Sequence, residues 1–247
     1  MDYNDNIGIG CDGAESLGEG LRQNIMCSQN FFRKMRKCMP ELVIENCSSG
    51  GHRLEPSMQA LCSMASFSDA HEWQAIPVIA ANVTRAILPA QSQIWAVLRK
   101  TDDDKRLYYS LCNTFLGRMC LSGEVYDLED WQWKIVKESI RLYKVCAPVI
   151  KYGRNYIYGP LNKSYNHLKG WQAVCRASDD EKQMLIVVHS FEDREEPLTI
   201  ALPGETVTWK TAELFCREGI SATIEKGVLT VSGLIKYDGL IVLAQVC

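Results

Sequence analysis

The sequence predicts an α/β fold in two parts: a strand–helix series over residues 1–164, followed by an antiparallel β-sandwich over residues 165–247. Two observations support this division. In the first part, short apolar stretches alternate with longer segments of helical periodicity, which is typical of a parallel sheet covered by helices. In the second part, helical patterns nearly vanish, and short β-branched stretches are separated by glycine, proline and acidic clusters.

The first part opens with a helix and a short strand. Glu15–Cys38 has apolar residues at helical spacing and is followed by Pro40, so a helix is predicted there. The apolar stretch Leu42–Ile44 predicts a buried strand. A turn that contains glycine then leads to a short predicted helix over Pro56–Cys62, and the next strand is predicted at Ala65–Phe67.

The series continues with three further helices and two strands. Trp73–Leu88 predicts a helix in which Pro77 either lies in the first turn or causes a kink. All predicted strands of this part are short and apolar on both faces, as buried parallel strands are. The remaining helices are predicted at Lys105–Leu116 and Leu128–Ile150, the latter with Asp127 as its N-cap, and the remaining strands at Ile94–Leu98 and Met119–Leu121.

Strand patterns dominate the second part. Several of them alternate between apolar and polar residues, as in a sheet with one buried face. The segment YGRNYIYGPLNKSYNHLKG, residues 152–170, is aromatic and irregular, so we expect a linker that packs across both parts. The predicted strands are WQAVCRA, MLIVVHSF, LTIALP, VTWKTAELF, SATIEKG, VLTVSG and LIVLAQV.

Composition limits the classes of partner. The chain has 247 residues, of which 47% are hydrophobic and 23% charged, as in ordinary globular proteins. A net charge of -3 argues against a nucleic-acid partner. No apolar stretch reaches the roughly 18 residues of a membrane span, so no membrane partner is predicted. The eleven scattered cysteines, without a CxxC pair, favour reduced thiols in a cytoplasmic protein over a zinc site.

Polar side chains follow the predicted strands in three stretches: MDYND (residues 1–5), ENCSSGGHRLE (45–55) and SFSDAHE (66–72). In parallel α/β barrels, catalytic groups project from the carboxyl ends of strands and from the loops that follow them. Each stretch also has a structural interpretation, because carboxylates after strands cap helices and because a glycine pair can simply form a turn.

Two carboxylates from neighbouring strands suit glycoside hydrolysis. A retaining enzyme needs an ionised carboxylate as nucleophile and a protonated carboxyl as acid, about 5 Å apart, and their surroundings must separate the two pKa values. Such chemistry implies no metal and no organic cofactor. Cys47 has no obvious base near it in the sequence, so a thiol nucleophile is a lesser alternative, which predicts inactivation by thiol alkylation.

Three motifs together resemble family 36 glycoside hydrolases, the bacterial α-galactosidase family. ENCSSGGHR is similar to the CxxGGGR segment of the family, and SFSDAHE is similar to its SDxxD segment. MDYND is similar to the end of its KxDxN segment. The order of the motifs and the β-rich C-terminal part also agree with the family, so the resemblance covers nearly the whole chain.

The resemblance implies a role for each matched residue. Asp2 would be the nucleophile that forms a glycosyl-enzyme, and Asp69 would be the acid/base. Asn4 would bond a sugar hydroxyl or hold Asp2 in place. The resemblance also implies an α-galactoside oligosaccharide as substrate, and Cys47, Gly50 and Arg53 would line the galactose subsite or brace its loop.

The sequence departs from the family pattern at several positions. His52 replaces the third glycine of GGGR, Glu55 follows Leu54 where the family often has an aspartate, and Glu72 stands in place of the second aspartate of SDxxD. No arginine follows SDAHE in the usual place. An α-N-acetylgalactosaminide therefore stays open as an alternative substrate.

The length of the chain adds a further expectation. Family members have an N-terminal β-domain and a full eight-stranded barrel of about 250 residues, whereas Met1 directly precedes the expected nucleophile here. We therefore expect the C-terminal half of a (β/α)8 TIM barrel followed by the β-sandwich, belonging to a truncated or split enzyme. It would self-associate as a homo-oligomer or need a complementing N-terminal half. A non-catalytic carbohydrate-binding or structural remnant is the alternative from another functional class.

Overall fold

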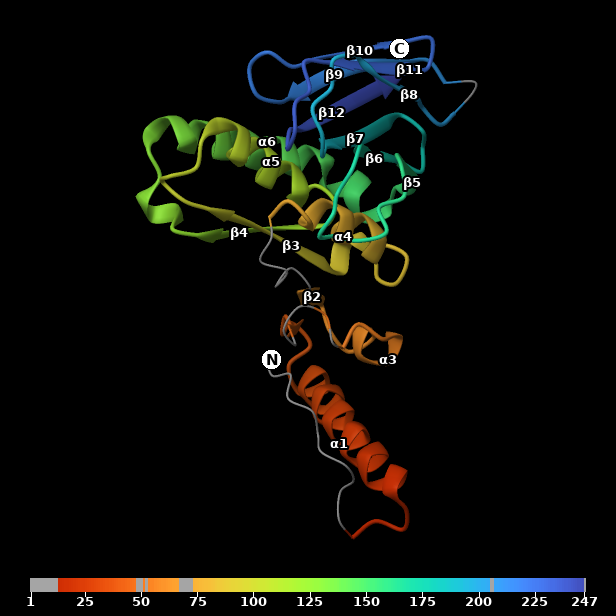
Figure 1. The fold of residues 1–247 in the computed structure, drawn as a ribbon. Helices are drawn as coiled ribbons and strands as arrows, with labels where there is room; N and C mark the ends of the chain where they lie inside the picture. The colour runs from red at the N-terminus through yellow and green to blue at the C-terminus, as the bar shows by residue number, and fades with distance from the viewer. Residues whose placement is uncertain (1–12, 48–50, 52, 67–72, 205–206, 247) are drawn as a thin grey trace. The chain divides into compact units, whose positions relative to one another are not determined.

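The computed structural model describes residues 13–47, 51, 53–66, 73–204 and 207–246 (Figure 1). The chain divides into two compact units, Met1–Asp69 and Ala70–Cys247. The predicted mixed α/β class is confirmed, with parallel strand pairing in the first half of the chain and antiparallel sheets in the second. Within these residues, no helix is both long enough and apolar enough to cross a membrane.

The first unit contains a long helix and a pair of short parallel strands. Helix α1, Leu17–Cys38, confirms the first predicted helix. Strand β1, Glu45–Asn46, pairs in parallel with β2, Met64–Ser66, and the short helix α3, Pro56–Gln59, lies between them in the chain. A small core joins these elements and consists of Phe32, Ile44, Met58, Leu61 and Cys62.

Two boundaries in this unit differ from the prediction. The strand predicted at Leu42–Ile44 is wrong, because only Ile44 is buried there and strand pairing begins at Glu45. Helix α3 ends at Gln59 rather than Cys62.

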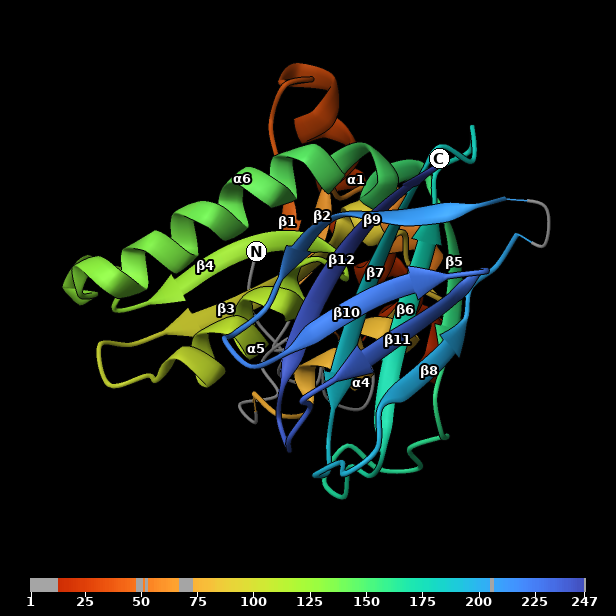
Figure 2. The same ribbon diagram turned by 90° about the horizontal axis from the view of Figure 1, so that it is seen from above.

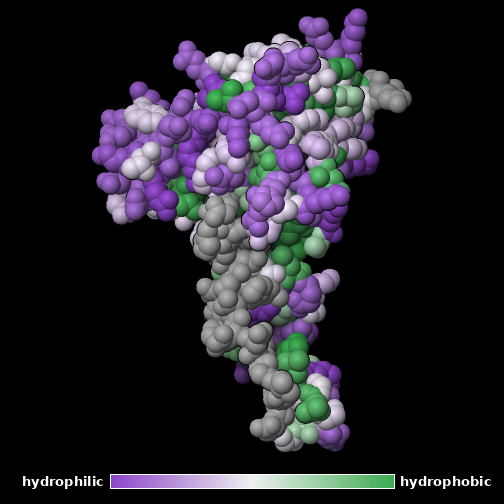
Figure 3. Space-filling model, in the orientation of Figure 1, coloured by the Kyte–Doolittle hydropathy of each residue, from purple (hydrophilic) through white to green (hydrophobic). Residues whose placement is uncertain are grey.

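Helix α1 exposes large apolar side chains, visible in the hydropathy view (Figure 3), with Leu17 80% and Phe31 56% exposed.

The second unit begins with helices packed on a parallel strand pair. Strands β3, Ser92–Leu98, and β4, Arg118–Gly123, pair in register from Gln93 opposite Arg118 to Leu98 opposite Gly123. Gly123 has φ +84°, and a Cβ there would lie 2.4 Å from the carbonyl oxygen of Leu98, so only glycine fits. The accompanying helical elements are α4 Ile76–Val83, η1 Pro89–Gln91, α5 Asp104–Thr114, η2 Val125–Asp127 and α6 Asp130–Tyr152.

The helices of this unit confirm the predicted series, with two corrections. Helix α4 is shorter than Trp73–Leu88, and Pro77 lies in its first turn. The N-cap predicted at Asp127 is wrong: Asp127 ends the short helix η2, and Glu129 is the residue that precedes α6.

Two antiparallel sheets form the rest of the second unit. The larger has the order β5-β6-β7-β12-β9, and the smaller has the order β10-β11-β8. All seven predicted strands are confirmed, but the expected irregular linker is wrong in part, because its residues Arg154–Tyr158 form β5 and pair with β6. The strands are β5 Arg154–Tyr158, β6 Trp171–Ala177, β7 Gln183–Ser190, β8 Leu198–Ala201, β9 Trp209–Phe215, β10 Ser221–Glu225, β11 Val228–Ser232 and β12 Gly239–Val246.

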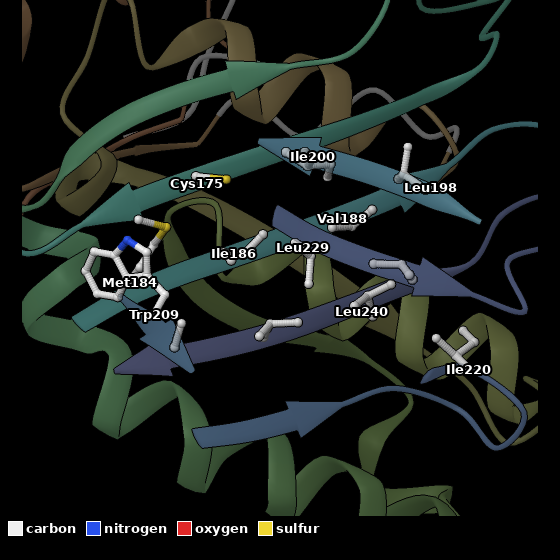
Figure 4. Close-up of a cluster of buried hydrophobic side chains, with 14 of the residues drawn as sticks. Cys175, Met184, Ile186, Val188, Leu198, Ile200, Trp209, Ile220, Leu229 and Leu240 are labelled. Carbon is white, nitrogen blue, oxygen red and sulfur yellow. The ribbon is translucent and has the colours of Figure 1, made fainter. Parts of the chain in front are cut away.

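The elements of the second unit form layers. The three-stranded sheet lies over the five-stranded sheet (Figure 2), and the two enclose a common core that includes Met184, Leu229 and Trp209 (Figure 4). Helix α5 contacts β3 and β4 on one side and β12 and β7 on the other, so it lies between the parallel pair and the larger sheet (Figure 1). Helix α5 therefore joins the antiparallel sheet to the parallel strand pair.

Candidate functional site

The loop after β1 is closed by an amide side chain. Asn46, only 4% exposed at the end of β1, donates from Nδ2 to the carbonyl oxygen of Arg53 at 2.6 Å. Gln59 of α3 donates to the same carbonyl oxygen at 3.3 Å. Asn46 and Arg53, which flank this segment, are therefore held together, and Cys47 is half-buried. Gly51 within the segment has φ +110°, a conformation that favours glycine.

The far end of this loop is supported by α3. Glu55 is the N-cap of α3 and accepts from the backbone N–H of Met58 at 3.1 Å and from the hydroxyl of Ser57 at 2.8 Å. The Ser57 hydroxyl in turn accepts from Gln29 of α1 at 2.8 Å. Glu55, two residues after Arg53, is thus linked to both α1 and α3.

The carboxyl end of β2 presents a buried hydroxyl. Ser66, the last residue of β2, is fully buried, and its Oγ has no hydrogen-bond partner among the described residues. It directly precedes the SFSDAHE residues 67–72, which the structure does not describe. An unsatisfied hydroxyl at this end of a parallel strand is the kind of group that a substrate or a neighbouring polar side chain can pair.

The predicted site residues divide into two groups. Asp2, Asn4, Gly50 and Asp69 lie outside the described residues, as do His52 and Glu72. Cys47 and Arg53 are described, and the structure shows that Asn46, the neighbour of Cys47, donates to the Arg53 carbonyl oxygen. The sequence reasoning missed Asn46 and Gln59 as the residues that close this loop. Asn46 lies inside the ENCSSGGHR motif itself, which is the one signal that could have identified it.

In the second unit, one glutamine joins the loops that follow β3 and β4. Gln132 is fully buried and donates from Nε2 to three carbonyl oxygens of the loop after β3: Arg99 at 3.3 Å, Lys100 at 3.2 Å and Asp102 at 2.9 Å. Its Oε1 accepts from the backbone N–H of Glu129 at 2.9 Å. A Lys100–Glu129 ion pair of 2.7 Å adds a second link. Glutamine three residues after an N-cap is a known helix-start pattern, which could have revealed this contact from the sequence.

Replacing Gln132 with alanine should lower the free energy of unfolding by about 2–3 kcal/mol, because several backbone groups in the two loops lose their partner. Urea unfolding measures this loss. Gln23→Ala is the matched control, since Gln23 bonds Glu19 on an exposed helix surface and should change stability by less than about 0.5 kcal/mol. A Gln132 variant as stable as the control would contradict the proposed link.

The described residues contain few candidates for other chemistry. In the part of the chain that the structure describes, no group of three or more His, Cys, Asp or Glu side chains is placed to hold a metal ion. No disulfide joins any two of the nine cysteines in that part. Burial raises the pKa of the Cys146 and Cys175 thiols to about 12, so neither is a thiolate at neutral pH.

The fold resembles solved structures of family 36 α-galactosidases. A variant of AgaA from Geobacillus stearothermophilus, in complex with 1-deoxygalactonojirimycin, matches with a TM-score of 0.78 and 14% identity over 100% of this chain and 35% of its own. The α-galactosidase from Lactobacillus brevis matches with a TM-score of 0.70 and 14% identity over 88% of this chain and 31% of its own. This chain thus spans about a third of the length of these proteins.

A more distant likeness extends to another glycosidase. An α-amylase from H. orenii matches with a TM-score of 0.59 and 12% identity over 99% of this chain and 60% of its own. No model of a protein family matches the sequence, and no curated protein matches it either. At such low identities the likeness concerns the fold alone. The solved structures that share this fold are those of glycoside hydrolases, both α-galactosidases and an α-amylase.

Proposed function

We propose that this chain is part of a retaining glycoside hydrolase that cleaves terminal α-galactosides, an α-galactosidase of the melibiase type. The observation that carries the proposal is the agreement of two features, the order of the motifs and the fold. Three motifs follow the order of family 36, and the fold resembles family 36 α-galactosidases over 100% of the chain. Complexes of the AgaA enzyme with raffinose and stachyose support α-galactoside oligosaccharides as the substrate class.

In this proposal, residues 1–164 supply the last strands of a (β/α)8 barrel and residues 165–247 form a β-sandwich. The parallel strands with polar loops at their carboxyl ends support the first assignment. The two antiparallel sheets around a shared core support the second.

The chemistry follows from two carboxyl groups. The Asp2 carboxylate attacks the anomeric carbon, while Asp69 protonates the leaving glycosidic oxygen. Asp69 then removes a proton from water, which cleaves the glycosyl-enzyme and restores Asp2. Cys47 and Arg53, in the closed loop after β1, line or brace the galactose subsite together with Gly50, and Asn4 bonds a sugar hydroxyl or orients Asp2.

The exposed apolar side chains of α1 support the proposal that the chain binds a second macromolecule. Leu17, Ile25 and Phe31 are 80%, 44% and 56% exposed, which is unusual for three large side chains of one helix. A second copy of the chain or a complementing N-terminal half would bury them. In this proposal, the isolated chain associates with itself or has low activity.

The test compares aryl α-galactosides with aryl α-N-acetylgalactosaminides as substrates, at a chain concentration for which gel filtration gives the oligomeric state. Faster hydrolysis of the galactoside supports the proposal, and faster hydrolysis of the N-acetyl analogue favours the α-N-acetylgalactosaminidase alternative. Binding of galactose without turnover of either substrate favours the non-catalytic remnant. A monodisperse monomer with ordinary glycosidase rates would contradict the need for a partner.

A further inference from the structure

A pocket of about 330 Å³ lies beside the first residues of β4 in the second unit. This volume is at the lower end of the range for small-molecule sites. Strand β4 and the C-terminal half of α6 supply most of the residues that line the pocket. Its polar side chains are those of Arg118, Tyr143 and Lys151, and the rest of its lining is apolar.

Both charged side chains of this pocket are cations. Arg118 and Lys151 are exposed, and within the described part of the chain neither forms an ion pair or a side-chain hydrogen bond. The Lys151 ammonium lies 4.8 Å from the centroid of the Tyr152 ring. A lysine in the last turn of a helix complements the helix dipole, but this role does not account for Arg118, which begins a strand. No carboxylate among the described residues lines the pocket.

The segments that form the pocket lack acidic residues over long stretches of the sequence. Residues 73–101, 105–123 and 139–178 each include lining residues, and none of the three stretches contains Asp or Glu, although the net charge of the chain is -3. The third stretch carries Arg141, Lys144, Lys151, Arg154, Lys163, Lys169 and Arg176. Of these, only Arg141 forms an ion pair within the described residues, with Glu213. Such a concentration of positive charge attracts anions.

A buried arginine adds positive charge next to the pocket. Arg176 of β6 is only 1% exposed, and its Nη2 donates to the carbonyl oxygen of Leu116 at 3.1 Å. The Tyr143 hydroxyl donates to the next carbonyl oxygen, that of Gly117, at 2.9 Å. The buried guanidinium and the phenol of the pocket therefore meet at adjacent carbonyl groups. Nη1 of Arg176 has no hydrogen-bond partner among the described residues.

The charge of Arg176 persists at neutral pH. Burial lowers its pKa to about 10, which still leaves the guanidinium protonated. Burial also raises the pKa of Tyr143, while a hydrogen bond from the Met119 N–H and the charges of Arg118 and Arg176 act in the opposite direction. Both guanidinium groups are therefore close enough to act on the same phenol, one from the pocket and one from the protein interior.

The opposite face of the same helix end has a different charge pattern. A second pocket there is lined by Tyr152 of α6 together with Asp179, Asp180 and Lys182. Asp180 pairs with Lys182 at 3.6 Å, so cations and carboxylates are mixed on that face. The excess of positive charge without a carboxylate therefore belongs to the pocket of Arg118 and Lys151.

We propose that the pocket of Arg118, Tyr143 and Lys151 binds a phosphate group, either of a small phosphorylated sugar or as inorganic phosphate. Arginine can hold two phosphate oxygens through paired N–H donors, and lysine adds a compact positive charge. The two cations repel each other in one pocket, and an anion between them offsets that repulsion. The inference is independent of the proposed function, because it concerns no galactoside.

Calorimetric titration of the full chain with inorganic phosphate and with glucose 6-phosphate, at constant ionic strength, tests the site. Both ligands should bind the wild type, and Arg118→Gln and Lys151→Gln should each weaken binding by about tenfold or more, since each removes a charge-assisted contact. Neither exposed side chain holds the fold through an ion pair, so both variants should fold. Lys226→Gln, at an exposed lysine in the turn between β10 and β11, makes the same charge change and should keep the wild-type affinity.

The two ligands distinguish the sources of the phosphate group. Binding of glucose 6-phosphate that is about tenfold or more tighter than that of inorganic phosphate supports a phosphorylated sugar, and equal affinities support inorganic phosphate. Glucose, which lacks the phosphate, should show no binding that depends on Arg118 or Lys151. The proposal is overturned if neither phosphate ligand binds the wild type with a Kd below about 10 mM. Wild-type affinity in both pocket variants, or an equal loss in Lys226→Gln, would overturn it as well.

Discussion

Asp2→Asn should reduce turnover of an aryl α-galactoside on the order of 10³-fold or more while galactose binding stays within about tenfold of the wild type. The amide has nearly the shape of the carboxylate, so the sugar subsite is preserved. It cannot form the glycosyl-enzyme bond, however, because it lacks the negative charge and the nucleophilic oxygen of the carboxylate. Initial rates and calorimetric titration with galactose measure the two quantities on the same protein.

Asp5→Asn is the matched control, because it makes the same change three residues away in the same MDYND stretch. It should retain the turnover of the wild type within a small factor. Equal losses in the two variants would argue that the N-terminal stretch only supports the fold. If the wild type and Asp2→Asn both bind galactose and neither hydrolyses the aryl α-galactoside, the non-catalytic carbohydrate-binding alternative would be favoured.

Local patterns made most of the fold predictable. Helix α1 and the strands of the antiparallel part carry their own periodicity, since each buries one face against a core. Strand β5 was missed because its sequence, RNYIY, is largely exposed and follows α6 directly. Strand β5 forms through its pairing with β6, which no local pattern announces. The buried Arg176 of β6 donates to the Asn155 side chain at 2.5 Å and to the carbonyl oxygen of Leu116 at 3.1 Å.

The polar contacts around the candidate site could not be predicted from the sequence. Cys47 and Arg53 were singled out through the ENCSSGGHR motif, and their role stays a prediction. Asn46 and Gln59 act through hydrogen bonds of their side-chain amides to the Arg53 carbonyl oxygen, and such bonds leave no periodic signal in a sequence. The ring contact between Trp73 and Tyr237 was equally hidden, since the two residues are 164 positions apart in the sequence.

Stability should fall steeply in acid because of one buried histidine. His189 of β7 is fully buried against the edge of the Tyr109 ring, and neither of its ring nitrogens has a hydrogen-bond partner among the described residues. Burial lowers the pKa of His189 to about 3 from its ordinary 6.5. Below pH 6.5 the unfolded chain binds a proton that the folded chain does not bind, so the folded state loses stability as the pH falls.

The size of this effect follows from the displaced pKa. At pH 4.5, two pH units below the unfolded value, the loss should be about 2–3 kcal/mol relative to neutral pH. The neighbouring Tyr109 does not contribute, because burial raises its pKa and it remains neutral throughout this range. Carboxyl groups whose pKa is lowered in the folded state, such as that of Asp180, also make the folded state less stable in acid. Only a comparison between variants therefore isolates the contribution of His189.

His189→Leu should remove that part of the pH dependence. Leucine has a similar volume and no unsatisfied nitrogen, so the variant should be at least as stable as the wild type at pH 7. Its stability relative to the wild type should then increase by about 2–3 kcal/mol between pH 7 and pH 4.5. His167→Gln, at an exposed histidine, should keep the wild-type slope. Urea unfolding between pH 4.5 and 7.5 measures all three proteins, and parallel curves for wild type and His189→Leu would mean that the buried ring is protonated or solvated in the folded state.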